Sequence, residues 1–558
     1  MAHTNLFSPE RETDNGGSPC SMPDTEPPYT PPHRVVGTEA FHRSQQTSTA
    51  DAAVEVYDGE LEGAVDWEEL DLSSIPPQDY PPRLLMMPVV KGVSISPHGG
   101  NGNINNWVKV DVKDPSKGSK PLELLAIAPT REQVGCCVDS DEISCVLLFD
   151  PSNDRLILRN NGSGTFYLTK LYGGGRKPVK GRGSIEVPLG EWNISGVFEG
   201  IVVEFKVLGH APCHVTQSFP TKRSVEDPTV LSKKTRLSAD QSAARVVALP
   251  ETSSNNPLLT LERGEVIRVG TGKDSYTLKR MAPISDQDQS SVWHAQHSEN
   301  PGKAVVVKLV KSDSRYRNAT VRAIGTWMSE VSIRSSIGGH HCIVPYIGSD
   351  ARFLSIYTEY VNAQDLTFHT KADNTFDGND VRAWTILGDM ASAISFLHAN
   401  NIVHGDIKLG NILYDPVRGA VLKGFHSSFR DGDPVPNGSA PWYLPPEFMS
   451  NPDQLGASSD MWALGIVMMW VLHVLPMPEK QVSWNAVDIH PRGHFEEVNE
   501  EALSNMQEWL SIVRAARSQL EGQGDELAEV VCALVKESDV DRINAETLVE
   551  RIEKCNRR

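Results

Sequence analysis

The pattern of hydrophobic and polar positions changes three times along the 558 residues. Over residues 83–210, short runs such as WVKVDV and TFYLTKLYG alternate apolar and polar residues between Gly, Asn and Pro turn signals. A period of two is typical of strands with one buried face. About seven such runs predict an all-β sandwich domain. A polar linker at 211–256 then leads to a region of mixed patterning, 257–558.

Residues 1–82 lack apolar periodicity and are rich in Pro, Ser, Thr, Asp and Glu, so we expect a disordered acidic and Pro-rich tail. Between Asp51 and Asp79 this tail holds ten acidic residues and no Lys or Arg. Apolar residues are scattered among the acids. Such a segment is either a solvated acidic tail or one that docks on a basic, apolar groove, with Ala64 to Leu72 as its core.

Strand and helix patterns follow each other in residues 257–558, which predicts an α+β domain. AVVVKLV, from Ala304 to Val310, is a continuous apolar strand that contains a single lysine, Lys308. A lysine in a buried strand is costly without a partner. The residues around Glu330 then have helical spacing of apolar positions, as does the stretch that ends at Leu397.

One apolar run, Met461 to Pro478, is close to the length of a membrane span. Ser458, Ser459 and Asp460 precede it as a helix cap, and prolines interrupt its end. We therefore interpret the run as a buried core helix and expect no membrane partner.

Composition narrows the class of protein. A hydrophobic fraction of 39% and a charged fraction of 22% describe a soluble chain with a proper core. The net charge of −19 argues against nucleic acid as the main partner. Eight cysteines without a CxxC pair indicate a reducing compartment and argue against a zinc site. Since the first residues have no apolar core, no secretory signal is expected, and we predict a cytoplasmic or nuclear protein.

The candidate chemistry lies in IVHGDIKLGNIL, from Ile402 to Leu413. His404, Asp406, Lys408 and Asn411 stand at the spacing H-x-D-x-K-x-x-N. This stretch resembles the catalytic loop of the protein kinase superfamily, in its serine/threonine form, with Gly405 in place of an arginine. The resemblance implies a bilobal fold in which Asp406 and Lys408 are catalytic and Asn411 holds a metal ion.

The same resemblance extends to both sides of this loop. It implies that Lys308 grips the ATP phosphates and pairs with Glu330. A hinge follows, and the implied ATP-binding residues there are the gatekeeper Thr358, Glu359 and Val361 beside the adenine, and Asp365 near the ribose. Downstream, the resemblance implies structural roles for Glu447 with Arg542 as an ion pair, and for Asp460 as an anchor of the catalytic loop.

Two parts of the family's pattern are missing. Gly424 stands where the metal-binding aspartate belongs, and glycine has no side chain to ligate Mg²⁺. The positions of the phosphate-cradling glycines are Ser285, Gln287 and Ser290, with Asp286 and Asp288 between them. We therefore expect ATP as a ligand while Mg²⁺ binding is in question, and an acid near a phosphate costs on the order of 1–4 kcal/mol.

These features favour a pseudokinase with weak or no phosphotransfer that acts as a protein-binding or regulatory module in signalling. The alternative is an active, divergent serine/threonine protein kinase that transfers the ATP γ-phosphate to protein Ser/Thr. A third possibility is an adaptor whose function lies in the β domain. The rhythm of Phe149 to Leu171 is similar to forkhead-associated-like sandwiches, but the phosphothreonine-reading residues of that family are not visible.

Overall fold

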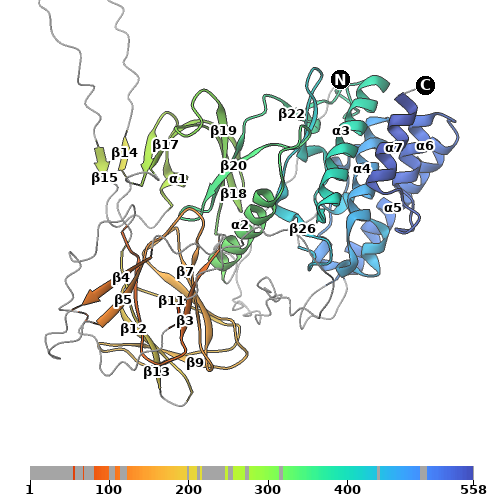
Figure 1. The fold of residues 1–558 in the computed structure, drawn as a ribbon. Helices are drawn as coiled ribbons and strands as arrows, with labels where there is room; N and C mark the ends of the chain where they lie inside the picture. Colours follow the sequence, from red (N-terminus) through yellow and green to blue (C-terminus); the bar gives the residue numbers. More distant parts are fainter. Residues whose placement is uncertain are drawn as a thin grey trace, which may run out of the picture.

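Three bodies follow one another in the computed structural model: a β-sandwich, a small lobe built mainly of sheet, and a larger helical lobe (Figure 1). The model describes residues 55–56, 67, 81–99, 107–112, 122–197, 200–209, 214–216, 246–248, 256–270, 275–312, 318–436, 440–490 and 499–556. The predicted α+β class, with a β-rich region ahead of a bilobal domain, is confirmed.

The β-rich body consists of two antiparallel sheets that share one core. One sheet has the strand order β10-β9-β12-β13-β2-β5-β4, and the other β1-β3-β6-β7-β8-β11. Side chains from both sheets, such as Leu147 and Phe205, form the core between them. The strands are β1 (Glu55–Val56), β2 (Leu84–Pro88), β3 (Ser94–His98), β4 (Trp107–Val112), β5 (Leu122–Ile127), β6 (Gly135–Asp139), β7 (Ser144–Phe149), β8 (Leu156–Asn160), β9 (Phe166–Lys170), β10 (Lys177–Val179), β11 (Ser184–Val187), β12 (Gly190–Ser195) and β13 (Ile201–Val207).

Two strands of the six-stranded sheet are buried on both faces. All five residues of β8 are buried, as are five of the six residues of β7. Because side chains alternate between the faces of a strand, a strand buried throughout must be covered on both sides. Cys145 and Leu147 face the sandwich core, whereas Val146 and Leu148 belong to a different cluster outside it.

The small lobe is an eight-stranded antiparallel sheet with one long helix, α2 (Ala319–Ser336). Its strand order is β15-β14-β16-β17-β18-β19-β21-β20. The elements are β14 (His214–Thr216), β15 (Val246–Ala248), α1 (Pro257–Thr260), β16 (Val266–Val269), β17 (Tyr276–Asp286), β18 (Ser290–His297), β19 (Ala304–Val310), β20 (Tyr346–Asp350) and β21 (Ser355–Glu359). The strands β14 and β15 lie within the range interpreted as a linker, because three-residue strands are too short to give a periodic pattern.

The large lobe is built around α4 (Ala457–Val471), which is buried on all sides, as expected for the apolar run that contains it. Helix α3 (Asp380–Ala399) begins after Asn379, whose side chain accepts a hydrogen bond from the Arg382 N–H. The other elements are β22 (Gln364–Asp365), β23 (Ile402–Val403), β24 (Ile412–Asp415), β25 (Gly419–Leu422), β26 (Phe429–Arg430), α5 (Glu500–Glu521), α6 (Glu526–Leu534) and α7 (Ala545–Asn556).

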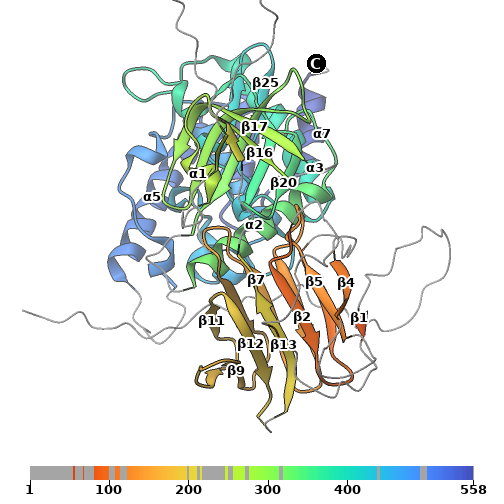
Figure 2. The same ribbon diagram turned by 90° about the vertical axis from the view of Figure 1, so that its left-hand side faces the viewer.

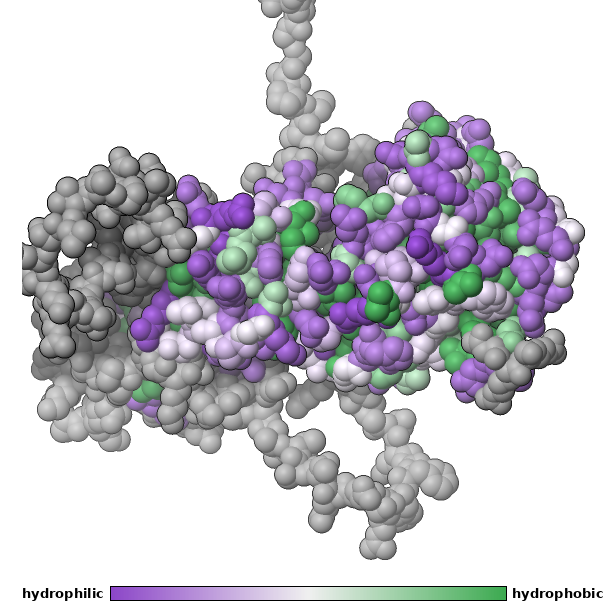
Figure 3. Space-filling view, turned by 90° about the horizontal axis from the view of Figure 1, so that it is seen from above, coloured by the Kyte–Doolittle hydropathy of each residue, from purple (hydrophilic) through white to green (hydrophobic). Residues whose placement is uncertain are grey.

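Among the described residues, no helix combines the length and the apolar character that a membrane crossing requires. On the face of the molecule in Figure 3, hydrophilic residues predominate and hydrophobic residues form small, separate groups. The apolar residues within 461–478 pack in the core of the large lobe.

Most of the predicted tail lies outside the described residues, but residues 55–56 and Trp67 contact the sandwich. Strand β1 pairs with β3, with Glu55 opposite Ile95. Trp67 is fully buried against the seven-stranded sheet, and its indole N–H donates to the Glu204 carboxylate at 3.4 Å. Within the segment from Ala64 to Leu72, Trp67 is the described residue, and it docks on the chain's own sandwich.

Candidate nucleotide and catalytic site

An ion pair between β19 and α2 marks the nucleotide side of the site. The Lys308 Nζ lies 2.6 Å from Glu330 Oε2, and the Glu330 side chain is 1% exposed. Burial alone would raise the pKa of Glu330, but the charges of Lys308 and Arg334 outweigh it and lower this pKa to about 2. The structure thus brings together the two residues that the sequence places 22 positions apart.

A second residue of α2 links this ion pair to the catalytic loop. Arg334, one helical turn after Glu330, donates to the Glu330 carboxylate at 3.3 Å. Its guanidinium lies over the Phe425 ring, 4.4 Å from the ring centroid. Phe425 in turn packs edge-on against the His404 ring, with 4.9 Å between centroids. Side-chain contacts therefore run without a break from α2 to the catalytic loop.

Asp406 lies at the centre of the catalytic loop and is held by its neighbours. One carboxylate oxygen, Oδ2, is 2.8 Å from Lys408 Nζ and accepts from Asn411 Nδ2 at 2.6 Å. The other oxygen, Oδ1, is buried and has no hydrogen-bond partner among the described residues. A buried carboxylate oxygen without a donor is costly unless a ligand supplies one. Among the described residues, Oδ1 therefore keeps an unused capacity to accept a hydrogen bond.

Hydrogen bonds to the buried carboxylate of Asp460 fix the backbone of this loop. The Asp460 carboxylate accepts from the backbone N–H of His404 at 2.8 Å and of Gly405 at 2.9 Å. Further from the loop, Arg542 makes a two-pronged ion pair with Glu447, at 2.7 and 3.0 Å. These three side chains therefore make the contacts expected of them.

The metal position differs from the family's pattern in geometry as well as in sequence. Gly424 has φ +88°, and a Cβ there would lie 2.5 Å from Asn411 Oδ1. The Asn411 amide fills this space, and its Nδ2 also donates to the Asp406 backbone oxygen at 2.7 Å. Mg²⁺ prefers an octahedral set of oxygen ligands. Of the two positions at which the family's pattern places a metal ligand, Asn411 offers one side-chain oxygen and Gly424 offers none.

The imidazole of His426 also lies near Asp406, with Nε2 3.8 Å from Asp406 Oδ2. Burial, together with the positive charge of Lys308, lowers the pKa of His426 to about 4. This imidazole is therefore neutral near pH 7 and brings no positive charge to the site.

The β17–β18 connection, where phosphate-cradling glycines would lie, is a closed hairpin. Ser285 pairs with Val292, and the Gln287 N–H donates to the Ser290 carbonyl oxygen at 2.8 Å. The carboxylate of Asp286 is 2.6 Å from Lys311 Nζ, and 73% of the side chain is exposed. The acid that the sequence places near a phosphate is thus paired with a lysine that directly follows β19.

The predicted adenine side lies at the junction of the two lobes. Thr358 on β21 is opposite Val306 on β19, so it shares a sheet face with Lys308, two residues further along β19. Val361 is buried against Val344 and Val421. Glu359 lies 3.9 Å from Lys303 Nζ.

Asp365 is the last of the predicted ATP-binding residues. Its carboxylate accepts from the Thr367 N–H and lies 3.5 Å from Lys423 Nζ. Lys423 directly precedes Gly424 in the sequence, so this contact links the hinge side of the site to the metal position.

Several residues of the site were missed by sequence reasoning. Arg334 was detectable by its helical spacing of four from Glu330, and Lys423 by its place beside Gly424. His294 stacks on Tyr360 of the hinge, with 4.5 Å between ring centroids, and no motif marks it.

A separate cluster in the connection between α2 and β20 was missed as well. His340, His341 and Cys342 bring three possible metal ligands within 4.8 Å of one another. The Nδ1 of His340 already accepts from the Cys342 N–H, and its Nε2 lies 3.3 Å from Ser392 Oγ.

With this geometry in place, the class of protein follows. A two-lobed fold holds a Lys–Glu pair in its small lobe and an anchored Asp-containing loop in its large lobe, which is the architecture of protein kinases. Residues 288–551 match the family model of the protein kinase domain. This part of the chain therefore belongs to the protein kinase superfamily.

Similar proteins include mitogen-activated protein kinase kinase kinase A of Dictyostelium discoideum, 28% identical over 33% of this chain and 19% of that protein. Mitogen-activated protein kinase kinase kinase YODA of Arabidopsis thaliana is 30% identical over 33% of this chain and 20% of its own length. Serine/threonine-protein kinase Sgk2 of Homo sapiens is 34% identical over 21% of this chain and 32% of its own. The chain thus spans between a fifth and a third of the length of these relatives.

Proposed function

We propose that this protein is a pseudokinase, a catalytically impaired member of the superfamily that acts as a protein-binding or regulatory module. One observation carries the proposal. The Asn411 amide bonds to Asp406 and occupies the space beside Gly424, where a metal-binding carboxylate would lie. Loss of a metal contact worth several kcal/mol lowers a rate by roughly a hundredfold or more.

The same site supports nucleotide binding without a metal ion. Lys308, Lys408 and Lys423 each keep part of the side chain exposed and project from three different segments around the cleft. Lysine ammonium groups can take over part of the charge that a metal ion neutralises on a triphosphate. We therefore propose ATP as the ligand and a binding free energy that Mg²⁺ leaves almost unchanged.

A thermal-shift titration of the full chain with ATP, in EDTA and in Mg²⁺ or Mn²⁺, tests this proposal. ATP at ten times its Kd contributes about 1.4 kcal/mol, which raises the Tm by roughly 2–5 °C for a domain of this size. We expect this rise in EDTA and no further rise with metal. Lys308→Ala should abolish the shift, whereas Lys371→Ala, at an exposed lysine of the large lobe, should keep it. A shift that requires the metal ion would contradict the proposal.

An active, divergent serine/threonine kinase is the second candidate, favoured by the intact Lys308–Glu330 pair and by the unpartnered Oδ1 of Asp406. Incubation with radiolabelled Mg²⁺–ATP and a mixture of generic protein substrates separates the two. We expect no transfer above that of Asp406→Asn. Robust transfer by the wild-type protein that Asp406→Asn removes would establish the kinase instead.

Proteins are the proposed partners, since the relatives are protein kinases by name and the chain carries a net charge of −19. We further propose a location in the cytoplasm or nucleus. Fluorescence of the tagged full-length chain in cells checks the location, and a secreted product would contradict it.

A further inference from the structure

The outer face of the six-stranded sheet packs against helix α2 of the kinase domain. Figures 1 and 2 both show α2 lying against the end of the sandwich at which β7 is labelled. A single hydrophobic cluster crosses this boundary. It joins Val134, Val146, Leu148 and Ile157 of the sandwich to Val310, Val321, Ala323, Ile324, Trp327, Ala351, Leu354 and Ile356 of the small lobe.

The small lobe covers the second face of β7 and β8, which explains why these strands are buried on both faces. Val146, Leu148 and Ile157 are each less than 10% exposed, yet they point away from the sandwich core. Ile324 and Trp327 of α2 meet them from the other side. Burial of such side chains contributes on the order of 25 cal/mol per Å² of apolar surface, so this contact is a packed interface.

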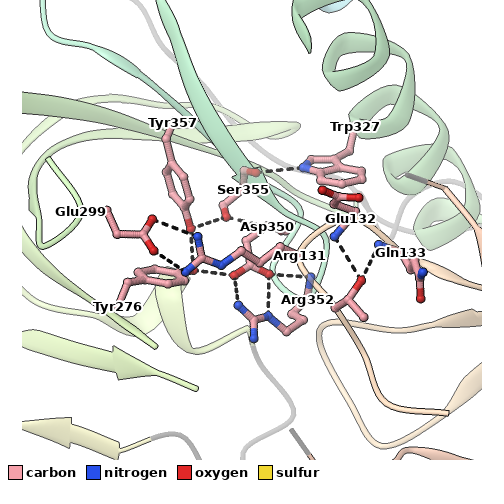
Figure 4. A network of polar contacts seen from close by, with 11 residues as sticks. Arg131, Glu132, Gln133, Tyr276, Glu299, Trp327, Asp350, Arg352, Ser355 and Tyr357 are labelled. Atoms are coloured by element: carbon pink, nitrogen blue, oxygen red, sulfur yellow. Dashed lines mark hydrogen bonds and ion pairs between the residues drawn. The ribbon is translucent and has the colours of Figure 1, made fainter. Parts of the chain in front are cut away.

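Polar contacts around Arg131 fix the orientation of the two bodies (Figure 4). The Arg131 guanidinium donates to both oxygens of Glu299, at 2.7 and 2.9 Å, and lies 4.5 Å from the centroid of the Tyr276 ring. Its backbone oxygen accepts from the Ala351 N–H at 2.8 Å. A two-pronged Arg–carboxylate pair constrains direction as well as distance.

The first turn of α2 has its own contacts with the sandwich. Asn318 precedes the helix with φ +60°, and its side-chain oxygen accepts from the Ser184 hydroxyl at 2.5 Å. The Thr320 hydroxyl lies 3.4 Å from a carboxylate oxygen of Asp150, a buried residue of the sandwich. The start of the helix is thus tied to the sandwich at two points.

The other half of the same helix forms the nucleotide site. Glu330 binds Lys308, and Arg334 contacts Phe425 beside the catalytic loop. Because an α-helix of this length moves as a rod, contacts at residues 318–327 set the position of residues 330–334.

The catalytic loop lacks the arginine that could provide an alternative constraint. Gly405 has φ +72°, and a Cβ there would lie 2.5 Å from the Ser427 carbonyl oxygen. A side chain is therefore excluded at the position from which an arginine would contact a phosphorylated segment.

We propose that the β-sandwich is a positioning domain for α2. Its outer-face residues Val146, Leu148 and Ile157, together with Arg131 in the connection between β5 and β6, hold Glu330 against Lys308. They do so without modification of the segment that follows Phe425. They are positioning residues, since they touch neither nucleotide nor substrate. The effect on α2 is independent of phosphotransfer, and its consequence for nucleotide affinity rests on the function proposed above.

Hydrogen exchange of the full-length protein, followed by mass spectrometry, tests the polar part of the interface. We expect Arg131→Glu to raise exchange of the α2 amides at least tenfold, because it places a carboxylate against Glu299. The swapped pair Arg131→Glu with Glu299→Arg should restore most of the protection. Arg514→Glu breaks a similar two-pronged pair with Glu537 in the large lobe and should leave α2 unchanged.

Leu148→Asp tests the apolar part, and Leu189→Asp, at a half-exposed leucine of the same sandwich, is its matched control. Circular dichroism verifies that each variant keeps its sheet content. We expect faster α2 exchange and at least fivefold weaker ATP binding for Leu148→Asp alone. Unchanged α2 exchange in both Arg131→Glu and Leu148→Asp would overturn the proposal. If the wild-type protein binds no ATP, the proposal of nucleotide binding fails. The exchange data alone then decide whether the sandwich positions α2.

Discussion

At the scale of single residues, Gly424 and Asn411 share one small space. The Asn411 amide oxygen lies 2.5 Å from the point where a Cβ of residue 424 would be. Asn411 is bonded to Asp406 through both the backbone and the carboxylate of that residue. The two positions therefore have to be considered together, and restoring one alone is not expected to restore the metal site.

Replacing Gly424 with aspartate should destabilise the protein. The positive φ costs a non-glycine residue about 1–2 kcal/mol, and the Cβ contact with Asn411 adds to this. Gly302→Asp is the matched control, because Gly302 has a similar φ of +83° and open space around it. Chemical unfolding should show a larger loss for Gly424→Asp than for Gly302→Asp, with no metal dependence of ATP binding. Equal losses would show that Asn411 moves aside freely.

The low pKa of Glu330 predicts a pH dependence of stability. The carboxylate takes up a proton near its ordinary pKa of 4.5 in the unfolded chain but only at about 2 in the folded one. Its contribution is therefore complete above pH 4.5 and is lost as the pH falls toward 2. The difference in unfolding free energy between wild type and Glu330→Gln, measured with urea, should be constant from pH 5 to 8 and shrink below 4.5. A difference that persists unchanged at pH 2 would contradict the ion pair.

At the scale of elements, each of the two sheets of the sandwich is covered on its outer face by residues from another part of the chain. The six-stranded sheet is covered on its outer face by α2, and the seven-stranded sheet by Trp67. Trp67 is held at two points, since its backbone carbonyl oxygen also accepts from Lys206 Nζ at 2.8 Å. One acidic segment thus uses an aromatic ring and a backbone contact to bind a sheet of the same chain.

Trp67→Ala should therefore destabilise the sandwich, even though Trp67 lies outside its core. Truncation of a fully buried tryptophan costs about 3–5 kcal/mol. Trp67→Phe keeps most of the packing and loses the hydrogen bond to Glu204, which is worth about 1 kcal/mol. Denaturant unfolding of the full chain measures both variants. An alanine variant as stable as wild type would show that this contact contributes nothing in solution.

Sequence patterns predicted the elements better than the contacts between them. The apolar run at β19, the helical spacing of α3 and the loop at Asp406 each carry a local signal of several residues. The cover of β7 and β8 has no such signal. The apolar run of β7 is consistent with two buried faces, but the partner helix begins more than 150 residues later. The conformation of Asn411 likewise depends on a missing side chain 13 residues away, which spacing alone cannot reveal.

At the scale of the whole molecule, the sandwich and the small lobe share a hydrophobic cluster, while the large lobe has its own core around α4. Domains joined by a large apolar interface unfold together, whereas those joined by a small polar one do not. The packed units of the protein therefore differ from the domain that the family model defines, because one hydrophobic cluster joins residues of the kinase domain to residues of the sandwich.

Calorimetry of the full chain should accordingly show the sandwich and the small lobe in one transition. Leu148→Ala removes a side chain from the shared cluster and should lower the stability of that transition by about 2–5 kcal/mol. Leu189→Ala, at a half-exposed position, should change it by less than about 0.5 kcal/mol. Independent melting of the sandwich, unaffected by Leu148→Ala, would contradict the shared unit.

The doubly covered strands β7 and β8 also have a consequence for how the protein is made. Ribosomes release Leu148 and Ile157 well before α2, whose first residue is Ala319. At about 5–20 residues per second, the newly folded sandwich presents an uncovered apolar surface for roughly 8–30 seconds. We therefore expect nascent chains to be prone to aggregation at this stage. Truncated products that end before Ala319 should aggregate through that surface, and polar residues at Val146 and Leu148 should keep such fragments in solution.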